Sequence, residues 1–407
     1  MNPTGVIIFA LTYALISSRR LGWLGLDRPA GALLGATACV AFGVLGPREA
    51  IGAVDGATLL LLFGMMGMGA FLSADGFFDE LEQRITRVAR TPSRLLGLVV
   101  WGAGGLSALI TNDAVCVLGA LLVVRTIRRH NLPALPFLLA LATGANTGSV
   151  ATLVGNPQNM LCGLLGGLSY RFHLALMAPV AVLGLALNHG LLAWSFRREL
   201  AGAALGEPEP AGSLSRASLL TLGVIGASAV AYTLGGDLAW TAAGGFVALM
   251  LIHRSDTREL WPRIDWALLL FFSGLFVVVE GLTRSGAPAA FFDRFPLASG
   301  QTGAGEWLRL AGIFLVGSNV VSNVPFILVV REQMATLHDP RLGWELLSMA
   351  STFAGNLTLL GSVANIIVAE AGHDVGGIGF WQYLKVGFPL AVTTTLLGVL
   401  WLLWVLG

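Results

Sequence analysis

Apolar residues recur in runs of membrane-span length along almost the whole chain, with short polar segments between them. About 20 consecutive apolar residues suffice to cross a bilayer as a helix. The pattern predicts ten spans, two of them interrupted by small and polar residues (135–168 and 343–369). The uninterrupted spans are expected at 5–18, 29–46, 56–74, 172–196, 218–235, 239–253, 265–283 and 382–406.

Two further apolar stretches, 95–124 and 306–335, are each too long for one span and too short for two. Each is broken near its middle, by Thr111-Asn112-Asp113 or by Ser322-Asn323-Val324-Pro325. A re-entrant helical hairpin fits this length, because irregular backbone at its tip is tolerated when it is buried in protein or lines a polar cavity.

Part of the pattern repeats about half the chain later. Thr152, Gly155 and Asn159 recur 206 positions on as Thr358, Gly361 and Asn365. Thr111-Asn112 corresponds to Ser322-Asn323, and the residues Asp55, Gly64 and Gly76 correspond to Asp265, Gly274 and Gly286. An internally duplicated apolar chain with paired Gly and Asn interruptions is typical of a secondary transporter.

The distribution of positive charge gives an orientation. If both broken stretches are re-entrant, 17 Lys and Arg residues lie on one side of the membrane and 7 on the other. The positive-inside rule makes the richer side cytoplasmic, with both termini outside. The first run, 6–16, is then an uncleaved span rather than a signal peptide, because Arg19 and Arg20 follow it. Localisation in the inner membrane of the cell is expected.

This orientation makes the two repeats inverted. Span 56–74 runs inward and its counterpart 265–283 runs outward, so hairpin 95–124 opens from the cytoplasm and hairpin 306–335 from outside. We expect a first repeat at 1–196, a flexible cytoplasmic linker at 197–217 and a second repeat at 218–407. Amphipathic segments at 77–85 and 291–295 are either surface helices or levers between a moving unit and a fixed frame.

Composition excludes several alternatives. Of the 407 residues, 55% are hydrophobic and 12% charged, against about 25% charged in soluble proteins. The fold class is therefore an all-α polytopic membrane protein. A net charge of +1 argues against nucleic-acid binding. We find no metal-ligand spacing, nucleophile–base pair or cofactor motif, which excludes most enzymes and predicts no cofactor apart from a coupling ion.

The broken helices supply the candidate substrate site. Each break exposes unpaired carbonyl and N–H groups, and Asn, Thr and Ser add hydrogen-bonding partners without a net charge. One half-site is expected from Thr111, Asn112, Asn146, Thr147, Thr152, Gly155, Asn156 and Asn159. The other is expected from Ser322, Asn323, Asn356, Thr358, Gly361, Ser362 and Asn365. The alternative is that such residues hold helices together, and Asn159 and Asn365 in particular can be structural braces.

Asp113 breaks the symmetry, because its counterpart is Val324. An intramembrane carboxylate is a functional candidate, and burial favours its uncharged form. We therefore expect Asp113, with Asn112 and Asn323, to handle a proton or sodium ion. The alternative is that Asp113 caps the return helix of the hairpin.

Other polar residues in the apolar runs have simpler interpretations. Glu280, near the outer end of its span, is expected to form a salt bridge at the rim, and His189 to be packed or hydrogen-bonded. Cys116 and Cys162 follow the two motifs of the first half-site. They can bind trivalent arsenic or antimony as thiolates, but buried cysteine is usually an inert small hydrophobe.

These motifs resemble the ion transporter superfamily, which includes the arsenite permease ArsB, the NhaD and P-protein group, CitMHS citrate carriers and divalent-anion symporters. The similar segments are 62–66, 76–79, Asn112-Asp113 and 155–159, while Thr111-Asn112 and Ser322-Asn323 occupy the places of the symporters' Ser-Asn-Thr motifs. The resemblance implies a scaffold, a mobile domain carrying both hairpins, elevator-type movement and a homodimer. Asp113 and Val324 depart from the third Thr of the symporter motifs, which puts in doubt a dicarboxylate site and its sodium sites.

The sequence thus predicts a secondary transporter for a small anion or oxyanion, coupled to protons or sodium. Arsenite or antimonite efflux is the leading specific alternative, for which the resemblance implies an ATPase partner. A sodium/proton antiporter is the third reading. A channel is disfavoured because it needs no paired hairpins opening to opposite sides.

Overall fold

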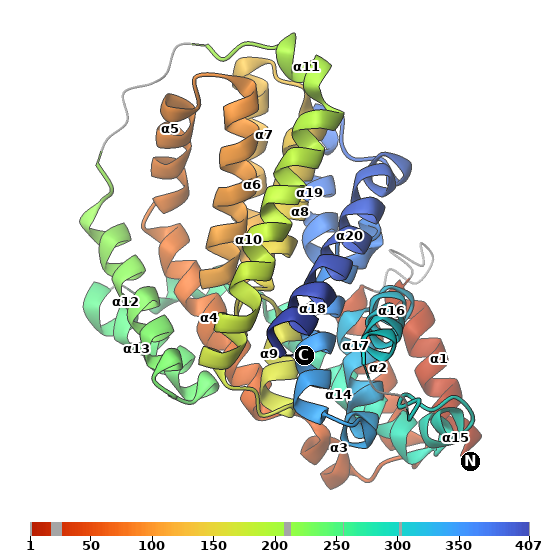
Figure 1. Cartoon of the computed structure of the whole chain (residues 1–407). Coiled ribbons are helices and arrows are strands. Elements are labelled where there is room, and N and C mark those ends of the chain that lie inside the picture. Colours follow the sequence, from red (N-terminus) through yellow and green to blue (C-terminus); the bar gives the residue numbers. More distant parts are fainter. Residues whose placement is uncertain (1, 18–26, 207–212, 255, 301–302, 407) are drawn as a thin grey trace.

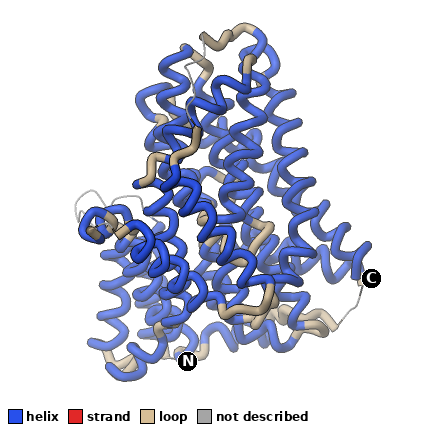
Figure 2. Tube along the Cα trace, turned by 90° about the vertical axis from the view of Figure 1, so that its left-hand side faces the viewer, coloured by secondary structure: helices blue, strands red, loops and turns tan. Residues whose placement is uncertain are grey.

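The computed structural model describes residues 2–17, 27–206, 213–254, 256–300 and 303–406, and in these ranges it contains helices and loops but no strands (Figure 2). The predicted linker centre and the residues Arg19 and Arg20 lie outside the described residues. Within the described ranges, five helices are long and apolar enough to cross a membrane by length and composition: α4 (Gly56–Ala74), α10 (Tyr170–Ser195), α12 (Arg216–Thr233), α14 (Trp266–Arg284) and α20 (Phe380–Leu406). The remaining predicted spans form α1 (Pro3–Ser17), α2 (Arg28–Ala41) and α13 (Leu238–His253), together with the interrupted pair.

Both predicted interruptions are present. The first interrupted helix consists of α8 (Ala134–Ser149) and α9 (Pro157–Leu165), and the second of α18 (Pro340–Ala354) and α19 (Val363–Ala371). Pro157 is the first residue of α9, a position where the N–H that proline lacks would have no helical partner in any case. Asn156 caps α9, because its side chain accepts the Asn159 N–H.

Both helix–break–helix stretches predicted as hairpins also occur. The first comprises α6 (Pro92–Leu109) and α7 (Asn112–His130), with Thr111 capping α7. The second comprises α16 (Ala304–Val321) and α17 (Asn323–Val330), which is continued by a 3₁₀ segment, η3 (Arg331–Thr336). Ser322 joins these helices with a φ of 68° and a ψ of 148°. Residues other than glycine rarely adopt this backbone conformation.

In the part of the chain that the structure describes, four short α-helices lie in the connections. The predicted amphipathic segments are α5 (Phe77–Ala89) and α15 (Ala287–Arg294). Two others were not predicted: α3 (Pro47–Ala53) follows the turn at Gly43, and α11 (Arg197–Ala201) occupies the start of the expected linker. Both helices begin directly after a predicted span, where the hydrophobic pattern indicates only a loop.

The helices pack as two groups. In one group, α8 packs against α6, α7 and α10, while α18 packs against α16 and α20. In the other, α4 packs against α13 and α14 against α2, with α1 and α12 alongside. Figure 1 shows α6, α7 and α10 side by side, with α12 and α13 to one side and α1, α2 and α14 at the lower right. The breaks lie within the first group, where it faces the second.

Packing between corresponding helices is reciprocal. A Cβ atom on Gly64 of α4 would lie 2.5 Å from the Ala242 carbonyl carbon of α13, and one on Gly274 of α14 would lie 2.7 Å from that of Ala32 in α2. Gly64 and Gly274 are 210 positions apart, as are Ala32 and Ala242. Small residues thus allow the two corresponding helix pairs to approach closely in the same way.

Candidate functional site

The two interrupted helices meet at a buried network of amide side chains. Asn146 of α8 is at its centre and makes the four hydrogen bonds that an amide side chain can form. Its Nδ2 donates to Asn356 Oδ1 at 3.2 Å and to Asn365 Oδ1 at 2.9 Å. Its Oδ1 accepts from Asn112 Nδ2 at 2.9 Å and from Ser362 Oγ at 3.2 Å. One side chain therefore connects both breaks with the tip of the first hairpin.

Asn159 and Asn365 brace their breaks in the same manner. Asn159 Nδ2 donates to the carbonyl oxygens of Ser149 and Thr152, ten and seven positions earlier, at 3.2 and 3.0 Å. Asn365 Nδ2 donates to those of Gly355 and Thr358, also ten and seven positions earlier, at 2.7 and 3.2 Å. Both side chains are fully buried. The brace interpretation of these two residues agrees with this geometry.

Contacts between the halves also occur in matched pairs. Asn146 donates to Asn365 Oδ1, and Thr352, 206 positions after Asn146, donates to Asn159 Oδ1 at 2.7 Å. In the same way Ser362 donates to Asn146, and Asn156 donates to Thr352 Oγ1 at 3.1 Å. Reciprocal contacts of this kind arise when two similar units are related by a two-fold axis.

Hydrogen bonds also attach each hairpin tip to a break. The Asn112 N–H donates to the Gly155 carbonyl at 2.9 Å, and Asn323 Nδ2 donates to that of Gly361 at 3.3 Å. Gly155 is required, because a Cβ atom there would lie 2.2 Å from the Ser149 carbonyl oxygen. Thr152 Oγ1 further donates to the Ala108 carbonyl of α6 at 2.8 Å.

A pocket of about 290 Å³ opens beside this network. Six of the predicted residues line it: Asn112, Asp113, Ser322, Asn323, Gly361 and Ser362. The other predicted residues do not line this pocket. They belong to the hydrogen-bonded network beside it, except Thr111, which lines a second pocket. Thr147 accepts from Asn356 Nδ2 at 2.9 Å, and Thr358 Oγ1 donates to Asn319 Oδ1 at 3.2 Å.

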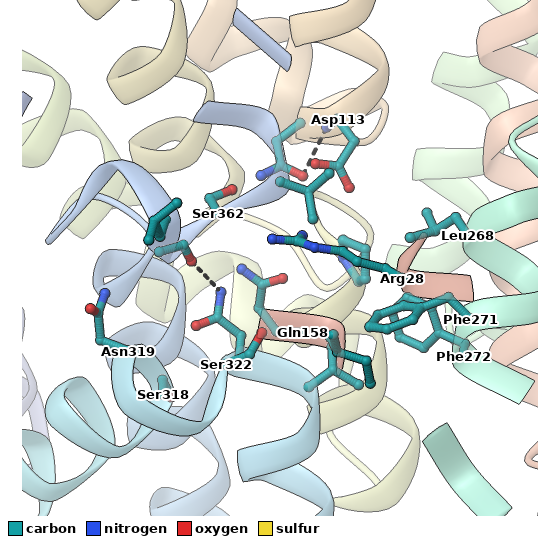
Figure 3. Close-up of a pocket in the computed structure, with 18 of the residues that line it drawn as sticks. Arg28, Asp113, Gln158, Leu268, Phe271, Phe272, Ser318, Asn319, Ser322 and Ser362 are labelled. Atoms are coloured by element: carbon teal, nitrogen blue, oxygen red, sulfur yellow. Dashed lines mark hydrogen bonds between the residues drawn. The ribbon is translucent and has the colours of Figure 1, made fainter. Parts of the chain in front are cut away.

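The pocket contains polar residues that sequence reasoning missed. Arg28 reaches in from the start of α2 and lies between Asp113 and Gln158 (Figure 3). Ser318 and Asn319 of α16 complete the wall on the side of the second hairpin. From sequence, Arg28 is one of the 17 positive residues assigned to the cytoplasmic side, and no local pattern marks a residue that reaches the site from another group of helices.

Two buried oxygen atoms of this wall lack partners among the described residues. Asn323 Oδ1 is one, and its assignment follows from the opposite nitrogen, which donates to the Gly361 carbonyl. Ser318 Oγ is the other. Because buried polar atoms are normally hydrogen-bonded, Asn323 Oδ1 favours a ligand that donates a hydrogen bond or a cation, whereas the Ser318 hydroxyl can donate or accept.

Asp113 lines a second pocket of about 290 Å³ as well. This pocket lies between α4 and α7 and includes Thr111, Arg263 and Asp265. Arg263 donates to Ser73 Oγ there at 3.2 Å. Asp113 thus lies at the boundary of the two pockets, in the first turn of α7, where its own N–H donates to Asn112 Oδ1 at 2.9 Å.

The remaining residues discussed from sequence lie outside these pockets. Glu280 accepts from Arg284 and Arg331, each at 3.1 Å, as the salt-bridge interpretation expected. His189 accepts from Trp101 Nε1 at 3.4 Å. Cys116 and Cys162 are free thiols, fully buried in the apolar core. Among the described residues, no cluster of three His, Cys, Asp or Glu side chains could hold a metal ion.

Comparison with known proteins identifies the family. Residues 13–354 match the citrate transporter family CitMHS. The silicon efflux transporter LSI3 of Oryza sativa subsp. japonica is 29% identical, covering 97% of this chain and 96% of that protein. The putative transporter arsB of Dictyostelium discoideum is 26% identical, covering 97% and 91%.

A solved structure shows the same fold. The YdaH transporter of Alcanivorax borkumensis matches 99% of this chain and 96% of that one with a TM-score of 0.54 and 14% identity. The resemblance stated from the motifs is confirmed. The chain belongs to the CitMHS citrate transporter family and is a multi-pass membrane transporter rather than an enzyme.

Proposed function

We propose that the chain is a secondary active transporter for a small, hydroxyl-bearing oxyanion or oxyacid, driven by protons or sodium. The observation that supports this best is the pocket between the two breaks, which is lined by one guanidinium and one carboxylate and has the buried, unpartnered oxygen Asn323 Oδ1 in its wall. At about 290 Å³ it lies at the lower limit of small-molecule sites, which are roughly 300–1,000 Å³. A solute of few atoms fits this space.

The charges of the lining favour an oxyacid over citrate. A tricarboxylate would bring three negative charges to a described lining with one cation, Arg28, and one anion, Asp113. Burying uncompensated charge is costly. A hydroxylated acid can donate O–H groups to Asn323 and Asp113 while its oxygen accepts from Arg28. The names of the relatives, silicon efflux transporter and arsB, support silicic and arsenous acid as the first substrates to test.

We assign the coupling ion to Asp113. Its position between the two pockets gives it access to the substrate space and to the cavity that contains Arg263 and Asp265. Competition of a proton and sodium for this carboxylate would suffice for a sodium/proton antiporter, which is the second candidate function. Binding of an oxyacid in the pocket is required for the oxyacid transporter and not for the sodium/proton antiporter, so it distinguishes these two functions.

Alternating access is proposed to follow the two helix groups. The group that carries the breaks and hairpins would move as the transport domain, and the group containing α2, α4, α13 and α14 would remain as the frame. The reciprocal contacts support two inverted repeats. Arg28, Arg263 and Asp265, on the side predicted to be cytoplasmic, line the pockets, which supports an inward-facing state.

Transport in proteoliposomes tests the proposal. We expect uptake of arsenite, antimonite or silicic acid that depends on a proton or sodium gradient, whereas citrate is not taken up. Asp113→Asn should lose gradient-driven uptake, and Asp374→Asn, which changes a surface carboxylate paired with Arg128 at 3.5 Å, should retain it. Uptake by the Asp113 variant at the wild-type rate would refute the coupling role. A gradient-driven proton–sodium exchange without any oxyacid flux would favour the antiporter.

A further inference from the structure

A buried histidine–glutamate pair lies behind the first break, outside the pockets. His173 of α10 and Glu345 of α18 are both fully buried, and His173 Nδ1 is 2.6 Å from Glu345 Oε2. The other ring nitrogen, Nε2, is 3.1 Å from the carbonyl oxygen of Val150, the residue that ends α8 at the break. The pair therefore joins a helix of the second half to the backbone of the first break.

The positions of the protons follow from these partners. A carbonyl oxygen can only accept, so Nε2 must carry a hydrogen and donate it to Val150. The short contact between Nδ1 and Glu345 then requires one proton, on either atom, because two lone pairs would repel each other. The pair is neutral overall in both arrangements, so no net charge is buried, although Glu345 Oε1 has no hydrogen-bond partner among the described residues.

The Val150 carbonyl belongs to the segment that shapes the site. Ser149 and Thr152 on either side are bound by Asn159, and the Gly155 carbonyl accepts from the Asn112 N–H at the hairpin tip. His173 is thus a further donor to the same break, supplied by a different helix. A shift of Val150 would be passed along the segment to Gly155 and Asn112, which lines the pocket.

We propose that His173 and Glu345 are positioning residues of the transport site: Glu345 orients the imidazole, and the imidazole fixes the break at Val150. The inference rests on the proposed function only in taking the neighbouring pocket as the transport site. Like the metal-bound histidines whose second nitrogen is held by a carboxylate, His173 needs Glu345 to define its orientation.

Glutamine at position 345 provides the decisive variant. Its amide NH₂ can donate to the Nδ1 lone pair of neutral His173, so Glu345→Gln keeps the orientation but cannot exchange a proton. Glu345→Leu and His173→Leu remove the hydrogen bond at similar volume. Glu370→Leu, on the exposed face of α19, is the matched control.

Hydrogen–deuterium exchange of the purified full-length protein tests the inference without a substrate. In both Leu variants, peptides covering 150–156 should exchange about tenfold faster, the factor expected for loss of one buried hydrogen bond. Peptides covering the second break, 355–362, should not change, and Glu345→Gln and the control should match wild type. Equal acceleration at both breaks would overturn the inference, because it would indicate general destabilisation.

Arsenite uptake in proteoliposomes then separates positioning from proton transfer. We expect the Leu variants to lose at least about tenfold in uptake and Glu345→Gln to stay near wild type. A glutamine variant that protects the break but loses gradient-driven uptake would overturn the positioning role in favour of proton transfer. If wild type takes up no arsenite, the proposed substrate fails while the exchange measurement still decides the role of the pair.

Discussion

Replacing Asn159 by leucine tests whether the matched amides hold the breaks. Asn159 makes four side-chain hydrogen bonds: its Nδ2 donates to the Ser149 and Thr152 carbonyls, and its Oδ1 accepts from Ser348 and Thr352. A net value of roughly 1 kcal/mol per bond predicts a loss of about 4 kcal/mol in the free energy of unfolding. Leucine has a similar volume, so the loss of hydrogen bonds dominates.

Two variants calibrate this value. Asn365→Leu removes three bonds, to Gly355, Thr358 and Asn146, and should cost about 3 kcal/mol. Asn188→Leu removes two contacts with Thr143, which is equally buried but outside the breaks: Asn188 Nδ2 donates to Thr143 Oγ1 at 3.0 Å, and Thr143 Oγ1 donates to Asn188 Oδ1 at 3.1 Å. The Thr143 hydroxyl can donate to the Leu139 carbonyl at 2.6 Å instead, so this variant should cost about 1–2 kcal/mol. The gain from burying a leucine is similar in all three and cancels in the comparison.

The assay is reversible unfolding in mixed detergent micelles, combined with arsenite uptake. We expect Asn159→Leu to lose the most stability, Asn365→Leu less and Asn188→Leu the least. Arsenite uptake should be retained only in the Asn188 variant. If Asn159→Leu costs no more than Asn188→Leu, the argument that the amides brace the breaks is refuted.

Three further predictions concern single positions. Ser322→Gly should raise the free energy of unfolding by about 1 kcal/mol, because glycine adopts a φ of 68° without strain; a loss of stability in the same unfolding assay would contradict this. Gly361→Ala should lower the free energy of unfolding by about 2 kcal/mol and reduce arsenite uptake, since its Cβ would lie 2.7 Å from the Ala354 carbonyl oxygen. Unchanged stability would contradict this, because it would show that the backbone of the second break can shift to accept the methyl group. The Gly46 N–H and the Arg284 guanidinium hold the pKa of exposed Glu49 below its usual value of 4.5. Its stabilising contribution is therefore present above pH 4.5 and is lost as the pH falls through the lowered pKa. Melting temperatures measured at descending pH should show a smaller acid loss for Glu49→Gln than for wild type.

The spans and breaks were predictable because they are local. Apolar run lengths indicated the helices, and Pro157 and the Gly and Asn residues marked the interruptions within a few positions. The second hairpin differs in its return half, where α17 ends at Val330 and η3 follows. The repeat predicted which residues would correspond, and the matched bonds of Asn159 and Asn365 follow that correspondence.

The pocket itself was only partly predictable. Arg28 reaches it from a helix more than 80 positions before Asp113, and a surface-like charge at the start of a span gives no sign of this. His173 and Glu345 likewise lie near span ends, where polar residues are expected to face water. Their pairing depends on how α10 and α18 pack, which hydrophobic periodicity does not determine.

The reciprocal contacts between the two halves also constrain how the protein is made. The first half is synthesised first, yet Asn146, Asn156 and Asn159 find several of their partners on Thr352, Asn365 and neighbouring residues of the second half. An amide without a partner is costly within a bilayer. The first interrupted helix can therefore complete its hydrogen bonds only after the second has been inserted, so that the centre of the molecule depends on the last part of the chain to be made.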